Sequence, residues 1–179
     1  MIGGSEYMDY SKYIGVTEGF PREGISFKDI SPLLRDPEAF KSIVDQMAKD
    51  IKRLGANVVI GPESRGFICG GPAAYAAGVG FVMARKAGKL PGKVVSETYT
   101  LEYAQATIEL PEFAIKKGDK VVIIDDLMAT GGTFKAVQNI VERMGGEVVG
   151  FINLIELTDL KGRDVLGDIP YISYIKYPH

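Results

Sequence analysis

Cysteine and histidine are almost absent from this chain of 179 residues, which has one of each, Cys69 and His179. A single cysteine excludes an internal disulfide. A Cys–His catalytic pair is not expected either, because the only histidine is the last residue. Cys69 lies in the apolar, glycine-rich run GFICGGPAAYAAG, which favours a small buried residue.

Long apolar runs and an excess of one charge are absent as well. No run approaches the roughly 20 apolar residues that span a bilayer, so no membrane association is expected. The first residues, MIGGSEYMDYSKY, lack the features of a secretory signal, which leaves the cytoplasm as the expected location; Met8 is an alternative natural start. The formal net charge of −2 gives no reason to expect nucleic acid binding.

The chain is expected to form one domain, in which strand and helix patterns alternate. The best-marked helix runs from Asp36, a capping residue followed by Pro37, to Gly55. The other expected elements are strands over 57–61, 79–85, 121–125 and 147–157, with helices over about 66–78 and after residue 133. This alternation predicts an α/β fold with a mainly parallel sheet flanked by helices.

Two regions do not fit this alternation. Residues 86–104, KAGKLPGKVVSETYTLEYA, show no buried face of their own, which suits either a mobile lid or a plain surface loop. Alternating residues near Glu102 also suit one strand of a β-hairpin. Residues 12–34, together with 157–179, are expected to pack as a small hood over the sheet edge.

The segment VVIIDDLMATGGT, residues 121–133, carries the strongest chemical signal. It places Asp125 and Asp126 at the carboxyl end of a strand, where open α/β sheets bind ligands. The residues TGGT, 130–133, then open a helix, and their backbone N–H groups and hydroxyls suit a phosphate monoester. Carboxylates repel phosphate, but they accept hydrogen bonds from vicinal ribose hydroxyls. A 5-phosphorylated ribose therefore satisfies both halves of the segment, with magnesium offsetting charge. Neither GxxxxGK[ST] nor a GxGxxG after a strand is present, so other phosphate motifs fit worse.

The same segment closely resembles the phosphoribosyl pyrophosphate motif of type I phosphoribosyltransferases. Further stretches resemble the adenine phosphoribosyltransferases, in the same order along the chain: GFPREGISFKDISPLL (19–34), GPESRGF (61–67), RKAGKLPG (85–92), ETYTLEYA (97–104) and LIELTDLKGR (154–163). The resemblance implies the type I fold and transfer of a phosphoribosyl group to adenine N9, which yields AMP and pyrophosphate for purine salvage. It also implies a homodimer, and Mg²⁺ that is held through the substrate rather than directly by the protein.

The resemblance assigns the phosphoribosyl pyrophosphate site residue by residue. Asp125 and Asp126 would hold the ribose hydroxyls and favour the positive charge that develops on the sugar. Glu102 would handle the proton that adenine loses, although a glutamate there could also simply face water. The 5-phosphate would be bound by Ala129, Thr130, Gly131, Gly132 and Thr133, and the pyrophosphate by Glu63, Ser64, Arg65 and Gly66. Arg85, Lys86 and Lys89 would add positive charge near the leaving group, and Tyr103 would help to close the lid.

The resemblance places adenine against the hood. Phe27 would stack on the purine, while Ser26 and Lys28 would pair with its edge through backbone groups. Leu157 would contact the base from the opposite side. Lys28 stands where the family often has arginine. Two further departures are Glu63-Ser64, where relatives vary between acidic and small residues, and Ala104, which stands where glycine is usual and is expected to stiffen the base of the lid.

Two alternatives to an adenine enzyme stay open. The substrate could be another purine such as hypoxanthine, guanine or xanthine, whose edge presents different hydrogen-bonding groups. The chain could instead be a regulatory module that binds phosphoribosyl pyrophosphate without catalysis. Such modules typically add a basic DNA-binding element, whereas residues 1–20 contain one lysine and no arginine.

Overall fold

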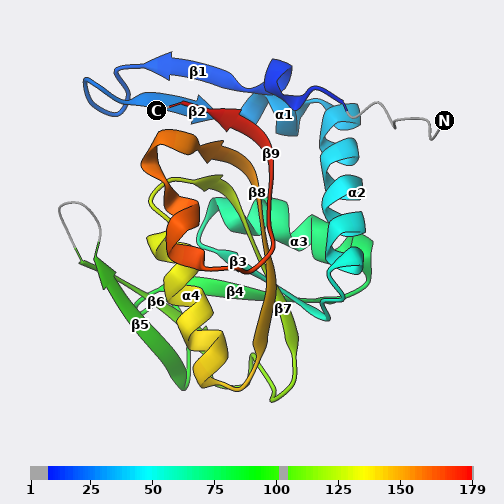
Figure 1. Cartoon of the computed structure of the whole chain (residues 1–179), viewed down its shortest axis with the longest axis vertical. Helices are drawn as coiled ribbons and strands as arrows, with labels where there is room; N and C mark the ends of the chain where they lie inside the picture. Colours follow the sequence, from blue (N-terminus) through cyan, green and yellow to red (C-terminus); the bar gives the residue numbers. More distant parts are fainter. Residues whose placement is uncertain (1–7, 101–104, 179) are drawn as a thin grey trace.

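A seven-stranded sheet forms the centre of the molecule in the computed structural model, which describes residues 8–100 and 105–178 (Figure 1). Its strands are β3 (Val58–Pro62), β4 (Gly80–Lys86), β5 (Val94–Thr100), β6 (Gln105–Pro111), β7 (Lys120–Met128), β8 (Glu147–Leu157) and β9 (Tyr171–Tyr177). Their order in the sheet is β5-β6-β4-β3-β7-β8-β9. Neighbours from β4 to β9 run parallel, while β6 is antiparallel to both β4 and β5. The predicted α/β class with a mainly parallel sheet is confirmed.

Helices cover both faces of this sheet. They are α1 (Ser31–Arg35), α2 (Pro37–Arg53), α3 (Arg65–Ala77) and α4 (Gly132–Arg143), with short 3₁₀ turns η1 (Tyr10–Tyr13), η2 (Thr158–Leu160) and η3 (Gly162–Leu166). Val122 and Ile124 of β7 belong to the core beneath α2 and α3, whereas Val121 and Ile123 belong to the core beneath α4. Side chains alternate across a strand, so a continuous apolar run fills both cores at once. None of the described helices is both long and apolar enough to cross a membrane.

Local sequence signals explain α2 well. Asp36 caps the helix, its side chain accepting two backbone N–H bonds of the first turn at 3.0 and 2.9 Å, and Pro37 occupies the first helical position. The helix ends just before Gly55, which has a φ of 71° that glycine adopts without strain. The side chains that face the core include Ile43, Met47 and Ile51. Burying each of these contributes about 1.5–3 kcal/mol.

The part of the chain expected to form the hood divides between two sheets. β1 (Gly15–Glu18) and β2 (Ser26–Asp29) form a separate antiparallel hairpin, which lies across one end of the main sheet in Figure 1. In the tail, β9 pairs in parallel with β8 as the last strand of the main sheet, and the joint hood stays a prediction. The end of the tail reaches the hairpin, where Lys28 Nζ lies 4.7 Å from the centre of the Tyr177 ring.

The expected lid region, residues 86–104, also has more structure than a loop. Its second half contains β5, which pairs with β6 in an antiparallel hairpin at the edge of the sheet. One face of β5 lies on α4, so the missing buried face is supplied by a helix that follows some thirty residues later. Part of this stretch therefore belongs to a β-hairpin, and its role as a lid stays a prediction. Glu102, Tyr103 and Ala104 lie outside the described residues.

Candidate functional site

Two adjacent carboxylates lie near the carboxyl end of β7. β7 continues beyond the expected end at residue 125, because Leu127 and Met128 still pair with β8. Asp126 is only 3% exposed, and Asp125 Oδ1 accepts the backbone N–H of Asp126 at 2.8 Å. Burial and the neighbouring negative charge of Asp126 raise the pKa of Asp125 well above its usual value. Burial also raises the pKa of Asp126, and the charge of Arg65 opposes that shift. The pair is thus held in a dry position that disfavours two negative charges.

Arg65, the first residue of α3, supplies a compensating positive charge. Its Nε lies 3.1 Å from Asp126 Oδ2, and its guanidinium carbon lies 5.6 Å from the centre of the Phe27 ring. The next residue, Gly66, lets α3 begin against β7, since a Cβ there would lie 2.8 Å from Pro62 and 3.0 Å from the Ile124 carbonyl oxygen. Arg65 therefore connects the acid pair to the β1–β2 hairpin.

Glu63, two residues before Arg65, forms a second charged group with Arg85 of β4. Glu63 accepts hydrogen bonds from Arg85 Nε at 3.2 Å, from Arg85 Nη2 at 3.3 Å and from the Lys86 backbone N–H at 3.1 Å. These bonds, the Arg85 side chain first, lower the pKa of Glu63. Arg85 Nη1 also donates to the Lys89 carbonyl oxygen at 3.3 Å, and the Glu63–Ser64 peptide is cis. Glu63 thus fixes the base of the loop that carries Lys86 and Lys89.

The loop after β7 encloses a cavity of about 140 Å³. Its lining consists of Asp125, Leu127, Met128, Ala129, Thr130, Gly131, Gly132, Thr133 and Phe134. The N-cap residue of α4 is Gly131, which has no side chain to cap the helix, so it leaves the backbone N–H groups of the first turn to other acceptors. This combination of N–H groups and hydroxyls suits a phosphate-sized anion.

Two glycines allow this loop to take its shape. Gly131 has a φ of 81°, and a Cβ at this position would collide with the Gly162 carbonyl oxygen. A Cβ at Gly162 would in turn collide with the Ala129 carbonyl oxygen. The loop and the start of η3 therefore touch backbone to backbone. Gly162 was not among the expected site residues, although it lies in the LIELTDLKGR stretch that matched the family.

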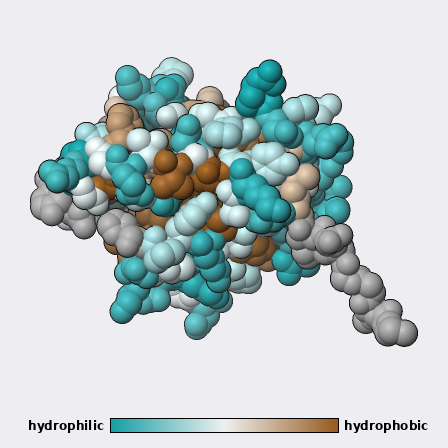
Figure 2. All heavy atoms as spheres, turned by 90° about the horizontal axis from the view of Figure 1, so that it is seen from above, coloured by the Kyte–Doolittle hydropathy of each residue, from teal (hydrophilic) through white to brown (hydrophobic). Residues whose placement is uncertain are grey.

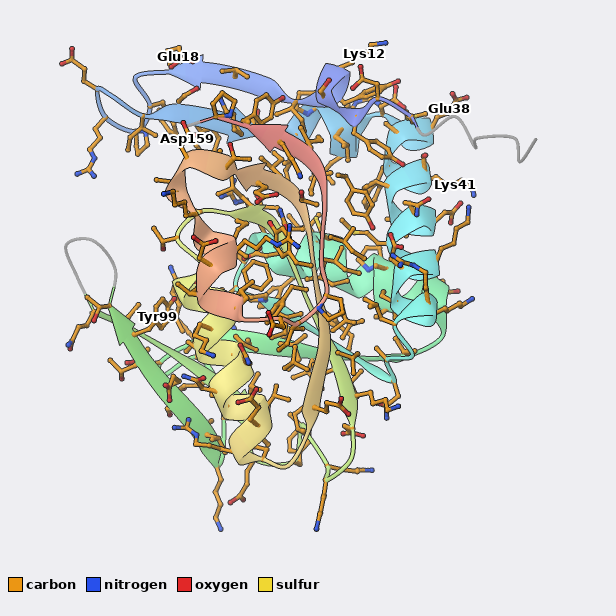
Figure 3. All side chains as sticks on the ribbon, in the orientation of Figure 1. Lys12, Glu18, Glu38, Lys41, Tyr99 and Asp159 are labelled. Carbon is orange, nitrogen blue, oxygen red and sulfur yellow. The ribbon has the colours of Figure 1, made fainter. Side chains whose placement is uncertain are left out.

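Tyr99 is another neighbour of the loop that sequence reasoning missed. It comes from β5, and its hydroxyl lies 3.1 Å from Thr133 Oγ1 (Figure 3). Its ring lies over Gly132, where a Cβ would be 3.2 Å from Tyr99 Cδ2. The ETYTLEYA stretch contains Tyr99, but only the fold brings β5 onto α4.

The β1–β2 hairpin presents the residues expected to meet the base. The Phe27 ring packs edge-on against Phe20 at 5.3 Å between centroids. The Lys28 side chain is buried, and its Nζ donates to Ser26 Oγ at 2.7 Å, which keeps the ammonium turned toward Ser26 and the Tyr177 ring. Leu157 ends β8 opposite Tyr177. Figure 2 looks down on this end of the molecule and shows hydrophobic residues gathered near the middle of a largely hydrophilic surface.

The backbone N–H and C=O groups of successive residues in β2 point alternately toward β1 and away from it. Gly19 N–H donates to the Ile25 carbonyl at 2.8 Å, which makes these two residues a hydrogen-bonded pair of the hairpin. Such pairs alternate along an antiparallel ladder, so the backbone groups of Ser26 and Lys28 point away from β1. Among the residues that the structure describes, no further strand pairs with that edge of β2.

Metal ligands are not concentrated at this site. Within residues 8–100 and 105–178, no three or more His, Cys, Asp or Glu side chains are grouped so as to hold a metal ion. Cys69 is buried, as the sequence predicts. Burial strongly raises the pKa of its thiol.

Known proteins share this arrangement over almost their whole length. Residues 33–169 match the phosphoribosyl transferase domain family. An adenine phosphoribosyltransferase from Clostridium botulinum is 51% identical over 170 residues, which cover 95% of this chain and 99% of that protein. The crystal structure of adenine phosphoribosyltransferase from Thermoanaerobacter pseudethanolicus has a TM-score of 0.90 at 44% identity and covers 93% of this chain and 97% of that one. The enzyme from Giardia lamblia, solved with 9-deazaadenine, has a TM-score of 0.89 at 38% identity, covering 96% of this chain and 97% of that one. Together with the acid pair and the loop that follows it, these matches show that the chain belongs to the adenine phosphoribosyltransferase family.

Proposed function

We propose that this protein transfers the 5-phosphoribosyl group from phosphoribosyl pyrophosphate to adenine and releases AMP and pyrophosphate, a reaction of purine salvage. The observation that carries the proposal is the position of Asp125 and Asp126 directly beside a phosphate-sized cavity. The cavity suits the 5-phosphate, and the acids suit the hydroxyls of the same sugar. The names of the related proteins agree with this reaction.

The acid pair has two roles in this proposal. Asp125 and Asp126 accept hydrogen bonds from the ribose hydroxyls and so orient the sugar. Bond cleavage at the anomeric carbon builds positive charge on the ring, which buried carboxylates stabilise more strongly than water does. The binding loop, residues 129–133, fixes the other end of the sugar, so the protein acts by positioning and electrostatics.

The leaving pyrophosphate is proposed to bind beside the basic residues Arg65, Lys86 and Lys89. Arg65 offers a planar fork that matches phosphate oxygens, and Lys86 and Lys89 lie on a loop whose base is fixed by Glu63 and Arg85. The Glu63–Ser64–Arg65–Gly66 turn contributes through its backbone. Because Glu63 already compensates Arg85, we assign Arg85 mainly to holding this loop.

Mg²⁺ is proposed to enter with phosphoribosyl pyrophosphate. The acid pair fits this, because a divalent cation carried by the substrate nearby would stabilise both buried carboxylates in charged form. The ion would supply positive charge that compensates the pyrophosphate as it leaves. The protein residues still bind and orient the sugar.

Adenine is proposed to bind along the free edge of β2. The backbone groups of Ser26 and Lys28 on this edge include both N–H donors and C=O acceptors, which match the ring nitrogen and amino group of adenine. A 6-oxopurine would set its carbonyl against a backbone carbonyl and leave polar groups unpaired. Phe27 stacks on one face of the base, and Leu157 contacts the other.

Glu102 and Tyr103 belong to the segment that joins β5 to β6. We propose that Glu102 accepts the proton that adenine loses when the N-glycosidic bond forms and that Tyr103 covers the site. A Glu102→Gln variant is expected to lower kcat about 10²-fold or more, in line with general acid–base catalysis, and to leave AMP affinity unchanged.

A homodimer is proposed through the apolar surface around β4. Phe113 is 83% exposed and Met83 is 45% exposed. They share an apolar groove of about 240 Å³ with Phe81, Val82, Leu90, Pro111 and Ala114. An exposed patch of this kind suits a second copy of the chain. Sedimentation of a Phe113→Glu variant tests it: a monomer supports this interface, and an unchanged dimer places the interface elsewhere.

A base panel tests the reaction directly. Purified protein, Mg²⁺ and phosphoribosyl pyrophosphate are incubated with adenine, hypoxanthine, guanine or xanthine, and nucleotide and pyrophosphate are measured. AMP from adenine alone supports the proposal. Turnover of an oxopurine would keep the phosphoribosyl transfer and overturn the assignment of the base. Tight binding of phosphoribosyl pyrophosphate with no product from any base would indicate the regulatory module.

A further inference from the structure

Tyr99 reaches the proposed phosphate loop from a different part of the fold. β5 lies at the edge of the sheet, and its residue Tyr99 sends its hydroxyl to within 3.1 Å of Thr133 Oγ1 in the first turn of α4. The ring lies against Gly132, so the contact involves both an apolar surface and a hydroxyl. Figure 3 shows Tyr99 near the carboxyl end of β5, on the side of the strand that faces α4.

The rest of β5 is fixed to the same helix, which limits the movement of Tyr99. Glu97, two residues earlier and on the same side of the strand, accepts a hydrogen bond from Asn139 at 2.9 Å and one from Arg143 at 2.7 Å. Both partners lie on α4. Tyr99 thus faces Thr133 from a strand whose position is fixed by the hydrogen bonds of Glu97 to α4.

The chemistry of two hydroxyls gives this contact a direction. The Thr133 hydroxyl has one proton, and a phosphate oxygen can only accept it. When Thr133 donates to phosphate, the hydrogen bond with Tyr99 can form only with Tyr99 as the donor. Each bond in such a chain polarises the next, so the Tyr99 proton strengthens the bond from Thr133 to the phosphate.

We propose that Tyr99 is a positioning residue for the 5-phosphate, acting through Thr133 and not by touching the ligand. The inference rests on the proposed function, because it requires Thr133 to bind the phosphate of phosphoribosyl pyrophosphate and AMP. Tyr99 orients the Thr133 hydroxyl and selects its rotamer. Affinity for any ligand that carries the 5-phosphate therefore depends on the Tyr99 hydroxyl.

Calorimetric titration with AMP and with ribose 5-phosphate tests this. Tyr99→Phe keeps the ring on Gly132 and removes only the hydroxyl. We expect the variant to bind both ligands about five- to tenfold more weakly, the size of one hydrogen bond. In steady-state assays the KM for phosphoribosyl pyrophosphate should rise similarly, while the KM for adenine stays unchanged.

Two further variants make the test specific. In a Thr133→Val background, Tyr99→Phe should have no additional effect, because its acceptor is gone. Thr98→Val is the matched control: Thr98 bonds Thr107 across the same hairpin at 2.8 Å but faces away from Thr133, so AMP affinity should not change. Thermal melting of each variant checks that it is folded.

The outcomes separate this inference from the proposed function. If wild-type protein binds AMP and Tyr99→Phe binds it equally well, the positioning role is wrong and the proposed function stands. A parallel rise in the KM for adenine, or an equal loss with Thr98→Val, would indicate general damage to the hairpin and also overturn the inference. Failure of the wild type to bind either phosphate ligand would overturn the proposed function, and this inference with it.

Discussion

Arg65 and Asp126 form an ion pair at the centre of the site: the arginine Nε lies 3.1 Å from Asp126 Oδ2. The two partners differ in environment, because the Asp126 side chain is 4% exposed and the Arg65 side chain is 41% exposed. A residue proposed for pyrophosphate thus compensates a residue proposed for the ribose. Substrate binding must redistribute this charge, since the phosphates and Asp126 both attract the same guanidinium.

Arg65→Ala is expected to weaken the binding of phosphoribosyl pyrophosphate about 10- to 100-fold, the range for loss of a charged hydrogen bond. The variant also leaves the buried Asp126 carboxylate without its cation, so its melting temperature should fall. Steady-state KM values and thermal unfolding measure the two effects. Arg35→Ala, which removes an exposed arginine from α1, is the control and should change neither. An unchanged KM for Arg65→Ala would remove Arg65 from the pyrophosphate site.

Asp125→Asn is expected to stabilise the protein while it abolishes most activity. The pKa of Asp125 is raised in the folded state, so its charged form is disfavoured there relative to the unfolded chain. Charged Asp125 therefore lowers stability above the folded-state pKa, and this loss disappears as pH falls below the unfolded-state value near 4. The variant should melt a few °C higher than wild type at pH 7–8, the effect of about 1 kcal/mol, and the gain should shrink toward pH 4.

Thermal melts of wild type and Asp125→Asn across this pH range provide the measurement. The exposed Asp168 serves as the control position, and Asp168→Asn should leave the melting temperature at pH 7–8 unchanged. A gain that grows as pH falls would have the wrong sign and would rule out burial of a charged Asp125 as its cause.

Phe27→Ala is expected to raise the KM for adenine about tenfold, because stacking on an aromatic ring contributes about 0.5–1.5 kcal/mol beyond the area that it buries. The affinity for ribose 5-phosphate should change little, since this ligand has no base. Tyr75→Ala removes a ring that is 90% exposed on α3 and should leave both values unchanged. Equal losses for adenine and ribose 5-phosphate would instead indicate general damage to the site and rule out stacking as the cause.

Gly131→Ala is expected to destabilise the protein by about 3 kcal/mol or more, because the substitution adds overpacking to the strain of a left-handed residue. Gly118→Ala separates the two causes: its φ is 88°, but apart from its chain neighbours no atom of the described residues lies within 4 Å of the added Cβ. Only the strain remains there, about 1–2 kcal/mol. Chemical denaturation of both variants gives the difference, and equal losses would mean that contact with Gly162 matters little.

The parts of the fold with strong local signals could be predicted from the sequence. α2 has a cap, a proline and a regular apolar face, and β7 is a continuous apolar run. β5 and β9 were harder because their burial depends on partners elsewhere in the chain. β5 needs α4 to cover one face, and β9 gains its place from pairing with β8.

The candidate site shows the same division. Residues 125–133 are contiguous, so one motif revealed them. Tyr99 and Gly162 contact this loop from 34 and 31 residues away, and only tertiary structure brings them there. The pairing of Arg65 with Asp126 likewise depends on where α3 begins relative to the end of β7, which no local pattern encodes.

The backbone contact between Gly131 and Gly162 means that the phosphate-binding motif is not portable. The loop keeps its shape because η3 packs against it. This contact is possible because both residues at the contact, Gly131 and Gly162, lack a Cβ. Residues 121–133 grafted onto another α/β scaffold would lack the segment that holds the phosphate loop in shape. The graft would also need a second segment, placed after the following strand as η3 is, with a glycine where it crosses the loop.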